Sequence, residues 1–254
     1  ILEDEPVTII SAVPYMLKKM LEDVQANDHC YSSAFRLVLL GGGTIDRATL
    51  NACEESGLPV VQCYGMTETC SQFVALSAEE APYHLGSVGK PLFTTQLRLV
   101  GEHHEIEIQT PALTPGYLNQ PAKFAAKHDG DWYRTGDVGH FDEDGFLYVD
   151  GRLDEMIISG GENIFPAEVE NVLRQYPGIQ EIAVVGRNDQ QWGAVPVAVV
   201  VSKQPVDFQQ LEAFGREHLA HYKVPKVYLQ TDALPKNASG KVQKFRLQDL
   251  VANA

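Results

Sequence analysis

The first third of the chain alternates short apolar runs with segments whose apolar residues recur at helical spacing. Apolar runs at 7–12, 35–40 and 59–63 predict buried strands, and the segments 14–23 and 46–56 between them predict helices. This order of strands and helices is typical of βαβ units. We therefore expect a parallel sheet with a ligand crevice at the carboxyl ends of its strands.

From about residue 87 the pattern changes to short strands separated by turns. Strands are predicted at 96–100, 105–109, 133–137 and 146–150. The segment 105–109, Glu-Ile-Glu-Ile-Gln, alternates polar and apolar residues, which predicts a strand with one face in water. This part of the chain is expected to form a small antiparallel β-barrel or sheet.

Beyond residue 154 the pattern predicts a compact α+β domain of roughly 100 residues. The expected elements are helices at 166–175, 207–220 and 243–251 and strands at 179–187, 194–202 and 226–231. The predicted fold class is therefore α/β and α+β. A βαβ portion at about 1–86 and a barrel portion at about 87–153 precede the small domain.

The stretch 150–166, Asp-Gly-Arg-Leu-Asp-Glu-Met-Ile-Ile-Ser-Gly-Gly-Glu-Asn-Ile-Phe-Pro, lies at the expected domain boundary. Up to Leu153 the chain has 10 Lys or Arg and 22 Asp or Glu, a net charge of −12. From Asp154 onward it has 10 and 12, a net charge of −2. We predict domains 1–153 and 154–254; a hairpin and loop within one domain is the alternative.

Composition narrows the class of protein. The chain has 254 residues, of which 44% are hydrophobic and 21% are charged, so a packed globular core is expected. We expect no membrane span, because no run approaches about 18 apolar residues. The four cysteines, at 30, 53, 63 and 70, include no Cys-x-x-Cys pair, which favours a reduced, cytoplasmic protein. The net charge of −14 argues against non-specific nucleic-acid binding.

The segment 64–69, Tyr-Gly-Met-Thr-Glu-Thr, follows a predicted buried strand and carries several ligand-binding groups. Gly65 would let the backbone approach a ligand closely. Thr67 could donate to a phosphate oxygen, and Glu68 could hold Mg²⁺ through a hard oxygen ligand. The alternative is a helix cap formed by Thr67 or Thr69.

Three other places are weaker candidates when each is taken alone. Gly41 to Gly43 follow a strand but lack a lysine at P-loop spacing, so they fit a strand-to-helix turn. Asp137 could accept hydrogen bonds from a ribose diol, or belong to a simple Gly-Asp turn. Lys241 could contact a polyphosphate or a carboxylate, or lie in an ordinary surface turn.

The order of these motifs is more specific than any one of them. The segments 64–69, 133–137, 151–170 and 234–241 together resemble the adenylate-forming acyl-CoA synthetase superfamily over essentially the whole chain. Within it, the segments at 64–73 and 159–163 look most like ligases that act on o-succinylbenzoate in menaquinone biosynthesis.

The resemblance implies an enzyme, an AMP-forming acid–thiol ligase. Such an enzyme makes an acyl-adenylate and pyrophosphate from ATP and a carboxylic acid, and then forms the CoA thioester with release of AMP. It implies ATP, CoA and the acid as small-molecule partners and Mg²⁺ as a cofactor. A homo-oligomer is compatible with the sequence, which identifies no interface for it.

The resemblance also implies roles for the nucleotide-binding residues. Tyr64 would pack on the adenine, Thr67 would touch the α-phosphate, and Glu68 would bind Mg²⁺. Asp137 and Arg152 would hold the ribose hydroxyls.

Further roles concern the acid and the phosphate. Lys241 would bridge the carboxylate and the α-phosphate during adenylation. Gly41, Gly42 and Gly43 would line the acyl pocket.

By the same resemblance, Asp154 is the hinge between the two domains. After adenylation the small domain would swing about it. This motion would remove Lys241 and bring Gly160 and Gly161 to the CoA channel.

The chain departs from the superfamily pattern at its start. The Ser/Thr/Gly-rich loop that grips the β- and γ-phosphates is absent, as is the N-terminal subdomain that would precede Ile1. We therefore expect a fragment that corresponds to the C-terminal half and does not turn over by itself. The alternatives are another aryl- or fatty-acyl-CoA ligase, a carrier-protein-loading adenylation domain, or a non-catalytic AMP-binding fragment.

Overall fold

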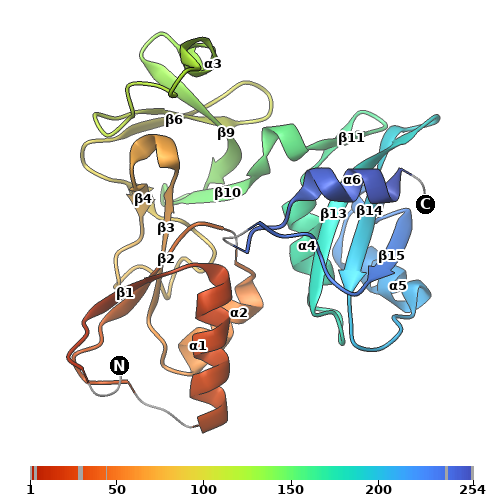
Figure 1. Ribbon diagram of the computed structural model, residues 1–254, viewed down its shortest axis with the longest axis horizontal. Coiled ribbons are helices and arrows are strands. Elements are labelled where there is room, and N and C mark those ends of the chain that lie inside the picture. Colours follow the sequence, from red (N-terminus) through yellow and green to blue (C-terminus); the bar gives the residue numbers. More distant parts are fainter. Residues whose placement is uncertain (1, 3–4, 28–30, 44, 238–239, 253–254) are drawn as a thin grey trace. The chain divides into compact units, whose positions relative to one another are not determined.

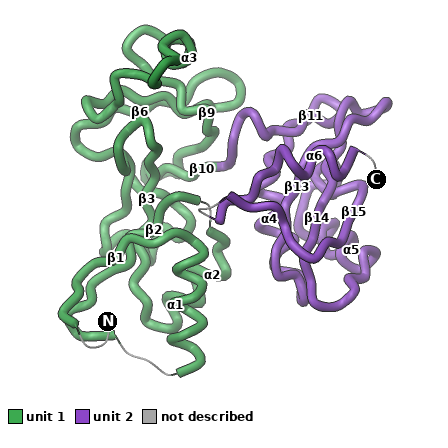
Figure 2. The backbone as a smooth tube through the Cα atoms, in the orientation of Figure 1, with its two compact units in different colours: residues 1–149 green, residues 150–254 purple. Residues whose placement is uncertain are grey.

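The computed structural model describes residues 2, 5–27, 31–43, 45–237 and 240–252. The chain divides into two compact units, Ile1–Val149 and Asp150–Ala254 (Figure 2). Asp154, the predicted first residue of the small domain, thus lies inside the second unit, and its role as a hinge stays a prediction.

The first unit begins with a sheet in the strand order β1-β2-β3-β4-β5. Its strands are β1 (Ile9–Ala12), β2 (Leu37–Leu40), β3 (Val60–Gly65), β4 (Gln72–Ala75) and β5 (Lys90–Pro91). β1, β2 and β3 are parallel, whereas β4 and β5 pair antiparallel. The expected parallel βαβ arrangement is confirmed, and the sequence pattern missed β4 and β5.

Two helices connect the parallel strands, α1 (Pro14–Asn27) and α2 (Arg47–Glu55) (Figure 1). Asp46 caps α2 because its carboxylate accepts the Thr49 N–H at 2.8 Å. Gly57, just beyond the helix, has a φ of 68°, a left-handed conformation that glycine adopts without steric cost. Apolar residues of both helices and of β1 and β2 form one core.

The second sheet of this unit follows the order β10-β9-β7-β6, with β8 paired to β9. Its strands are β6 (Gln96–Val100), β7 (Glu105–Gln109), β8 (His128–Asp129), β9 (Trp132–Phe141) and β10 (Leu147–Arg152); the short helix α3 (Pro121–Ala125) precedes β8. β6 and β7 have the predicted bounds, whereas β9 continues well beyond the predicted 133–137.

The expectation that β7 has one face in water is wrong. Glu107 lies on the face predicted to be wet, yet it is fully buried. Its carboxylate accepts hydrogen bonds from Arg98 Nε at 2.8 Å and from Arg134 Nε at 3.2 Å. The two guanidinium groups come from the neighbouring strands β6 and β9, and they cover the acid and compensate its charge.

The second unit is built on a sheet in the order β12-β11-β14-β13, with β15 paired to β14. The strands are β11 (Ile157–Ser159), β12 (Glu162–Ile164), β13 (Glu181–Asp189), β14 (Gly193–Val201) and β15 (Val227–Thr231). The helices are α4 (Pro166–Leu173), α5 (Phe208–His218) and α6 (Lys244–Val251), and the 3₁₀ turns η2 (Leu153–Glu155) and η3 (His221–Lys223) lie between elements.

Both faces of this sheet are covered, which explains the unbroken apolar runs at 182–185 in β13 and at 194–201 in β14. Ile182 and Val184 belong to a core that includes residues of α4 and α5. Their neighbours Ala183 and Val185 point to the opposite face and share a core with residues of α6. α6 therefore lies on the face of the sheet opposite to α4 and α5 (labelled in Figure 1).

Candidate active site

The glycine run and the loop after β3 lie at the same edge of the first sheet. β2 and β3 are parallel neighbours, and the chain leaves them into Gly41 and into η1 (Thr67–Thr69) respectively. A Cβ atom on Gly41 would lie 3.1 Å from Cys63 Sγ. The structure thus brings together the two loops that the sequence singled out.

The glycine run also serves as a close-packed turn. Gly42 has a φ of 78°, and a Cβ atom there would lie 3.2 Å from a methyl group of Val13. A Cβ atom on Gly43 would meet Pro14 at 3.5 Å. This geometry accounts for Gly42 without a ligand, so the acyl-pocket role of the run stays a prediction.

Two sequence motifs meet through a hydrogen bond between Tyr64 and Asp137. The Tyr64 hydroxyl, at the end of β3, donates to Asp137 Oδ2 at 2.5 Å. Asp137 lies on β9 and is 8% exposed, and its backbone N–H donates to Thr135 Oγ1 at 3.0 Å. The Tyr64 ring meets Phe73 edge-on at 4.6 Å between centroids. An aromatic ring and a carboxylate are therefore fixed side by side at this edge.

Gly65 occupies a β-bulge where β3 meets β4. The register of the strand pair shifts between Tyr64 and Gly65. A Cβ atom on Gly65 would lie 2.3 Å from the carbonyl oxygen of Ser71, a distance that no side chain tolerates. The backbone alone therefore requires glycine at this position.

The two hydroxyls of η1 have different surroundings. Thr69 is buried; its hydroxyl accepts the Met66 N–H at 3.2 Å and lies 2.7 Å from the carbonyl oxygen of Ser71. Thr69 therefore makes the local capping contact that was the alternative interpretation of this motif. Thr67 is exposed, and within the described ranges its hydroxyl has no hydrogen-bond partner, so it can reach a ligand.

Glu68 is held by a chain of tyrosine hydroxyls. The Tyr117 hydroxyl donates a short hydrogen bond to Glu68 Oε1 and lies 3.1 Å from the Tyr133 hydroxyl. Since the Tyr117 proton points to Glu68, Tyr133 donates to Tyr117. Burial raises the pKa of Tyr133, and the Tyr117 contact and the nearby charge of Glu68 raise it further. These two hydrogen bonds connect Glu68 through Tyr117 to the fully buried Tyr133, and they hold its carboxylate in place.

The described residues offer one carboxylate for magnesium rather than a protein cage. Among them, no group of three or more His, Cys, Asp or Glu side chains could hold a metal ion. Mg²⁺ is usually bound through one or two carboxylates together with substrate phosphates and water. Glu68 fits this pattern as a single hard oxygen ligand, and its role as a magnesium ligand stays a prediction.

Two predicted residues of the second unit form a local ion pair. Arg152, at the end of β10, donates from Nε to Asp154 Oδ1 at 3.2 Å. The side chains are 36% and 72% exposed, so the pair adds little to stability. The ribose role of Arg152 and the hinge role of Asp154 both stay predictions.

Gly160 and Gly161 form the two-residue turn of the β11–β12 hairpin. Their φ angles are 61° and 91°, and positive φ is what a type I′ turn requires at its two central positions. The Gly160 N–H donates to the carbonyl oxygen of Trp192 at 2.8 Å. A Cβ atom on Gly160 would lie 2.8 Å from the indole ring of Trp192. The glycine pair is thus a packed turn with a half-exposed tryptophan against it.

Lys241 lies on a loop that is closed by Asn237. The Lys241 N–H donates to Asn237 Oδ1 at 2.9 Å, and the Asn237 N–H donates to the Lys241 carbonyl oxygen at 2.9 Å. Lys241 is exposed, and its ammonium group has no ion pair among residues that the structure describes. Residues 238 and 239 of the motif, like Cys30, lie outside the described residues. The loop therefore presents Lys241 as an exposed cation that makes no ion pair with any described residue.

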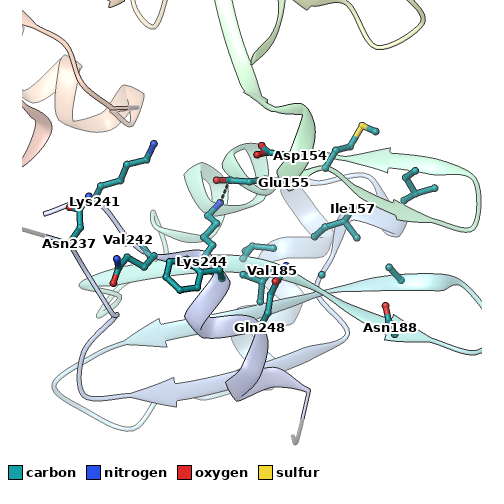
Figure 3. Close-up of a pocket in the computed structure, with 17 residues that line it drawn as sticks. Asp154, Glu155, Ile157, Val185, Asn188, Asn237, Lys241, Val242, Lys244 and Gln248 are labelled. Atoms are coloured by element: carbon teal, nitrogen blue, oxygen red, sulfur yellow. Dashed lines mark hydrogen bonds and ion pairs between the residues drawn. The ribbon is translucent and has the colours of Figure 1, made fainter. Parts of the chain in front are cut away.

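A pocket of about 570 Å³ lies in the second unit beside this loop (Figure 3). Its lining comes from η2, β11, β13, β14, the Lys241 loop and α6, and it includes Asp154, Glu155, Lys241 and Lys244. In Figure 3 the Lys244 ammonium points to Glu155, whereas the Lys241 ammonium stands apart from the other labelled groups.

Two family models match the chain. A model described as AMP-binding enzyme matches residues 1–118, and a model described as AMP-binding enzyme C-terminal domain matches residues 168–241. The chain belongs to the AMP-binding enzyme family. The motif at 64–69 lies in the first match, and Lys241 is the last residue of the second.

Curated relatives and solved structures agree with this family. A 2-succinylbenzoate–CoA ligase of Bacillus licheniformis is 45% identical over 254 residues, which cover 97% of this chain and 52% of the relative. An o-succinylbenzoate CoA synthetase from Bacillus subtilis, in complex with the acyl-adenylate intermediate, matches with a TM-score of 0.88 and 42% identity over 98% of this chain and 51% of that chain. A structure of the same synthetase in complex with ATP and a magnesium ion matches with a TM-score of 0.87 and 42% identity. This match covers 96% of this chain and 52% of that chain. The chain spans about half the length of the curated relatives it matches.

Sequence reasoning missed Tyr117 and Lys244 in this AMP-binding chain. Tyr117 contacts Glu68 across 49 residues, and Lys244 contacts Glu155 across 89 residues. Neither contact follows from a local pattern. Lys244 lies three residues after Lys241, within the helix predicted at 243–251, and that helix was the only part of its environment that the sequence indicated.

Proposed function

We propose that this chain forms part of an AMP-forming acid–CoA ligase. The reaction joins a carboxylate to the α-phosphate of ATP, releases pyrophosphate, and then transfers the acyl group from AMP to the CoA thiol. The observation that carries this proposal is the Tyr64–Asp137 hydrogen bond beside η1. It sets an aromatic ring, a carboxylate and an open threonine hydroxyl at the strand edge where α/β sheets bind ligands.

The proposed acid is o-succinylbenzoate, whose CoA thioester would serve menaquinone biosynthesis. This choice is supported by relatives at 42–46% identity that are named 2-succinylbenzoate–CoA ligase. The Bacillus subtilis structure that contains the matching acyl-adenylate supports it too.

Each candidate residue would have its own role in the adenylation step. Thr67 would donate to the α-phosphate, and Tyr64 and Asp137 would hold the adenosine. Lys241 would place a cation where the acid oxygen attacks phosphorus; removing one such preorganised contact typically costs about 10²–10³ in rate. Glu68, held by Tyr117, would orient the magnesium ion, which supplies charge neutralisation on the phosphates when it is bound.

The proposed second half-reaction uses the second unit. Asp154 would act as the pivot, since hinge residues at element ends absorb large backbone changes. The rotation would exchange Lys241 for the Gly160–Gly161 turn beside the thioester-forming centre. Arg152 would stay with the ribose, and Gly41 to Gly43 would line the acyl pocket.

We extend the proposal to a cytoplasmic location. ATP and CoA are used there, and the described cysteines Cys53, Cys63 and Cys70 are free thiols. Separately, no described helix is both long and apolar enough to cross a membrane.

Product analysis tests the function directly. A protein of the relatives' full length that contains this sequence would be incubated with ATP, Mg²⁺, CoA and a panel of aromatic and fatty acids. Mass spectrometry should detect o-succinylbenzoyl-CoA as the main thioester. Preferred transfer to a pantetheinyl carrier protein would instead indicate a carrier-loading adenylation domain, and AMP binding without any thioester would indicate a non-catalytic nucleotide-binding protein.

A further inference from the structure

Lys244 connects three elements of the second unit through two ion pairs. Its ammonium lies 2.8 Å from Glu155 Oε2 on η2 and 2.9 Å from Glu170 Oε1 on α4. The same Glu170 oxygen accepts the Val184 N–H of β13 at 2.8 Å. The start of α6 is therefore tied to the body of the sheet and to the turn η2, which contains Asp154.

The site is largely buried and its charges depend on one another. The side chains of Lys244, Glu170 and Glu155 are 18%, 11% and 34% exposed. A lysine at the first position of a helix is disfavoured by the helix dipole, and the two carboxylates offset that cost. The two acids raise the pKa of Lys244 although burial opposes this, so the lysine stays charged. Without it, two neighbouring carboxylates would be left uncompensated.

Lys244 also fixes the exit of the Lys241 loop. Only two residues separate the two lysines, and the loop between 235 and 243 closes on itself. Gln243 N–H donates to the Pro235 carbonyl oxygen at 2.8 Å, and Lys236 forms a β-bridge with Val242. Lys244 follows directly after Gln243, and its ion pairs tie this end of the loop to Glu155 and Glu170.

We propose that Lys244 is a positioning residue for Lys241, holding the Lys241 loop in a fixed relation to η2, the turn that contains the predicted hinge residue Asp154. The inference rests on the proposed function and adds a residue to it. Because Glu155 is bound to Lys244, the backbone rotation must occur at Asp154 or before it. From Glu155 onward the second unit would move as one body that carries Lys241 with it.

Separated half-reactions test this role in the full-length protein. Lys244→Met should lower ATP–pyrophosphate exchange by about 10²-fold, because small misplacements of a catalytic group have effects of this size. Thioester formation from supplied acyl-adenylate and CoA, which does not use Lys241, should change by less than about twofold. Lys244→Arg should restore most of the exchange. In a Lys241→Ala background, Lys244→Met should cause no further loss of exchange.

The matched control is Lys223→Met. Lys223 bridges to Glu168 of the same helix α4 at 2.7 Å, but it does not touch the Lys241 loop. It should leave both half-reactions unchanged. Equal losses of both half-reactions in Lys244→Met, or a further loss in the Lys241→Ala background, would overturn the positioning role.

A second measurement does not depend on activity. Hydrogen exchange of amides at 240–243 should be faster in Lys244→Met than in the parent 254-residue chain, whereas β13 and β14 keep their protection. Unchanged hydrogen exchange of the amides at 240–243 would overturn the positioning role of Lys244, even if the enzyme proved to catalyse another reaction. If Lys244→Met does not fold, Glu155→Gln, which leaves the Glu170 pair intact, should show the same changes at smaller size. Absence of pyrophosphate exchange in the unsubstituted full-length protein would count against the proposed function instead.

Discussion

Removing the Tyr64 hydroxyl tests whether the bond to Asp137 organises the site. In Tyr64→Phe the ring keeps its edge-on contact with Phe73, because only the hydroxyl is deleted. The lost bond is short, 2.5 Å, and its acceptor Asp137 is 8% exposed. The change therefore isolates one interaction between β3 and β9.

The expected loss of stability in Tyr64→Phe follows from the charge of its partner, the Asp137 carboxylate. Hydrogen bonds to charged groups contribute about 1.5–3 kcal/mol to stability. Asp137 has a further interaction besides this one, so we take the lower end of the range, about 1.5 kcal/mol. Because 1 kcal/mol shifts the melting temperature of a domain of roughly 150 residues by about 2–4 °C, we expect a decrease of about 3–6 °C.

Calorimetry of the 254-residue chain would measure the effect, with Tyr83→Phe as the matched control. Tyr83 is 83% exposed, and its hydroxyl has no hydrogen bond in the described part of the chain, so its loss should leave the melting temperature unchanged. AMP titration should show weaker binding by Tyr64→Phe alone. Identical melting temperatures for the two variants would refute the organising role of the Tyr64–Asp137 bond.

Four further changes have defined outcomes. Gly65→Ala should destabilise the first unit by about 1–3 kcal/mol in urea titrations, because the Cβ atom would meet backbone 2.3 Å away; an unchanged midpoint would contradict the bulge geometry. Gly160→Ala should be destabilising through its φ of 61° and the Trp192 contact, and Trp192→Ala should relieve part of that cost in a double-mutant cycle; strict additivity would rule out the contact. Burial raises the pKa of the Cys53 thiol from its usual 9.0 to about 11, so the stability that the neutral thiol contributes is complete below pH 9 and is lost as the pH rises to about 11. The melting temperature of Cys53→Ala should therefore fall less between pH 9 and pH 11 than that of the parent. An equal fall in both proteins would disprove the raised pKa of Cys53. Asp154→Pro should impair thioester formation more than pyrophosphate exchange in the full-length protein, whereas equal loss of both would exclude it as the hinge.

The fold was largely predictable where one local pattern decided the structure. Strands at 96–100 and 105–109 were obtained with their observed bounds, because alternation and flanking turns both mark them. The β11–β12 hairpin was missed, since its strands have three residues each and its Gly160–Gly161 turn resembles a ligand loop. Glu107 was predicted in water because its arginine partners lie on other strands.

Sequence motifs proposed the members of the candidate site but did not predict the contacts between them. Tyr64 and Asp137 were each recognised from motifs, yet the bond between them spans 73 residues. Only the folded η1 turn shows that Thr69 is buried and hydrogen-bonded to the backbone whereas Thr67 is exposed. Contacts of this kind depend on how distant strands are brought together, which local sequence patterns do not reveal.

ATP–pyrophosphate exchange with o-succinylbenzoate is the most direct test of the proposed adenylation reaction and of the role of Lys241 in it. The assay would use a protein of the relatives' full length that contains this sequence, together with its Lys241→Ala variant. We predict rapid, acid-dependent exchange in the parent and a loss of about 10²–10³-fold in the variant. Exchange that is absent with every acid tested, or that is unaffected by Lys241→Ala, would contradict this prediction.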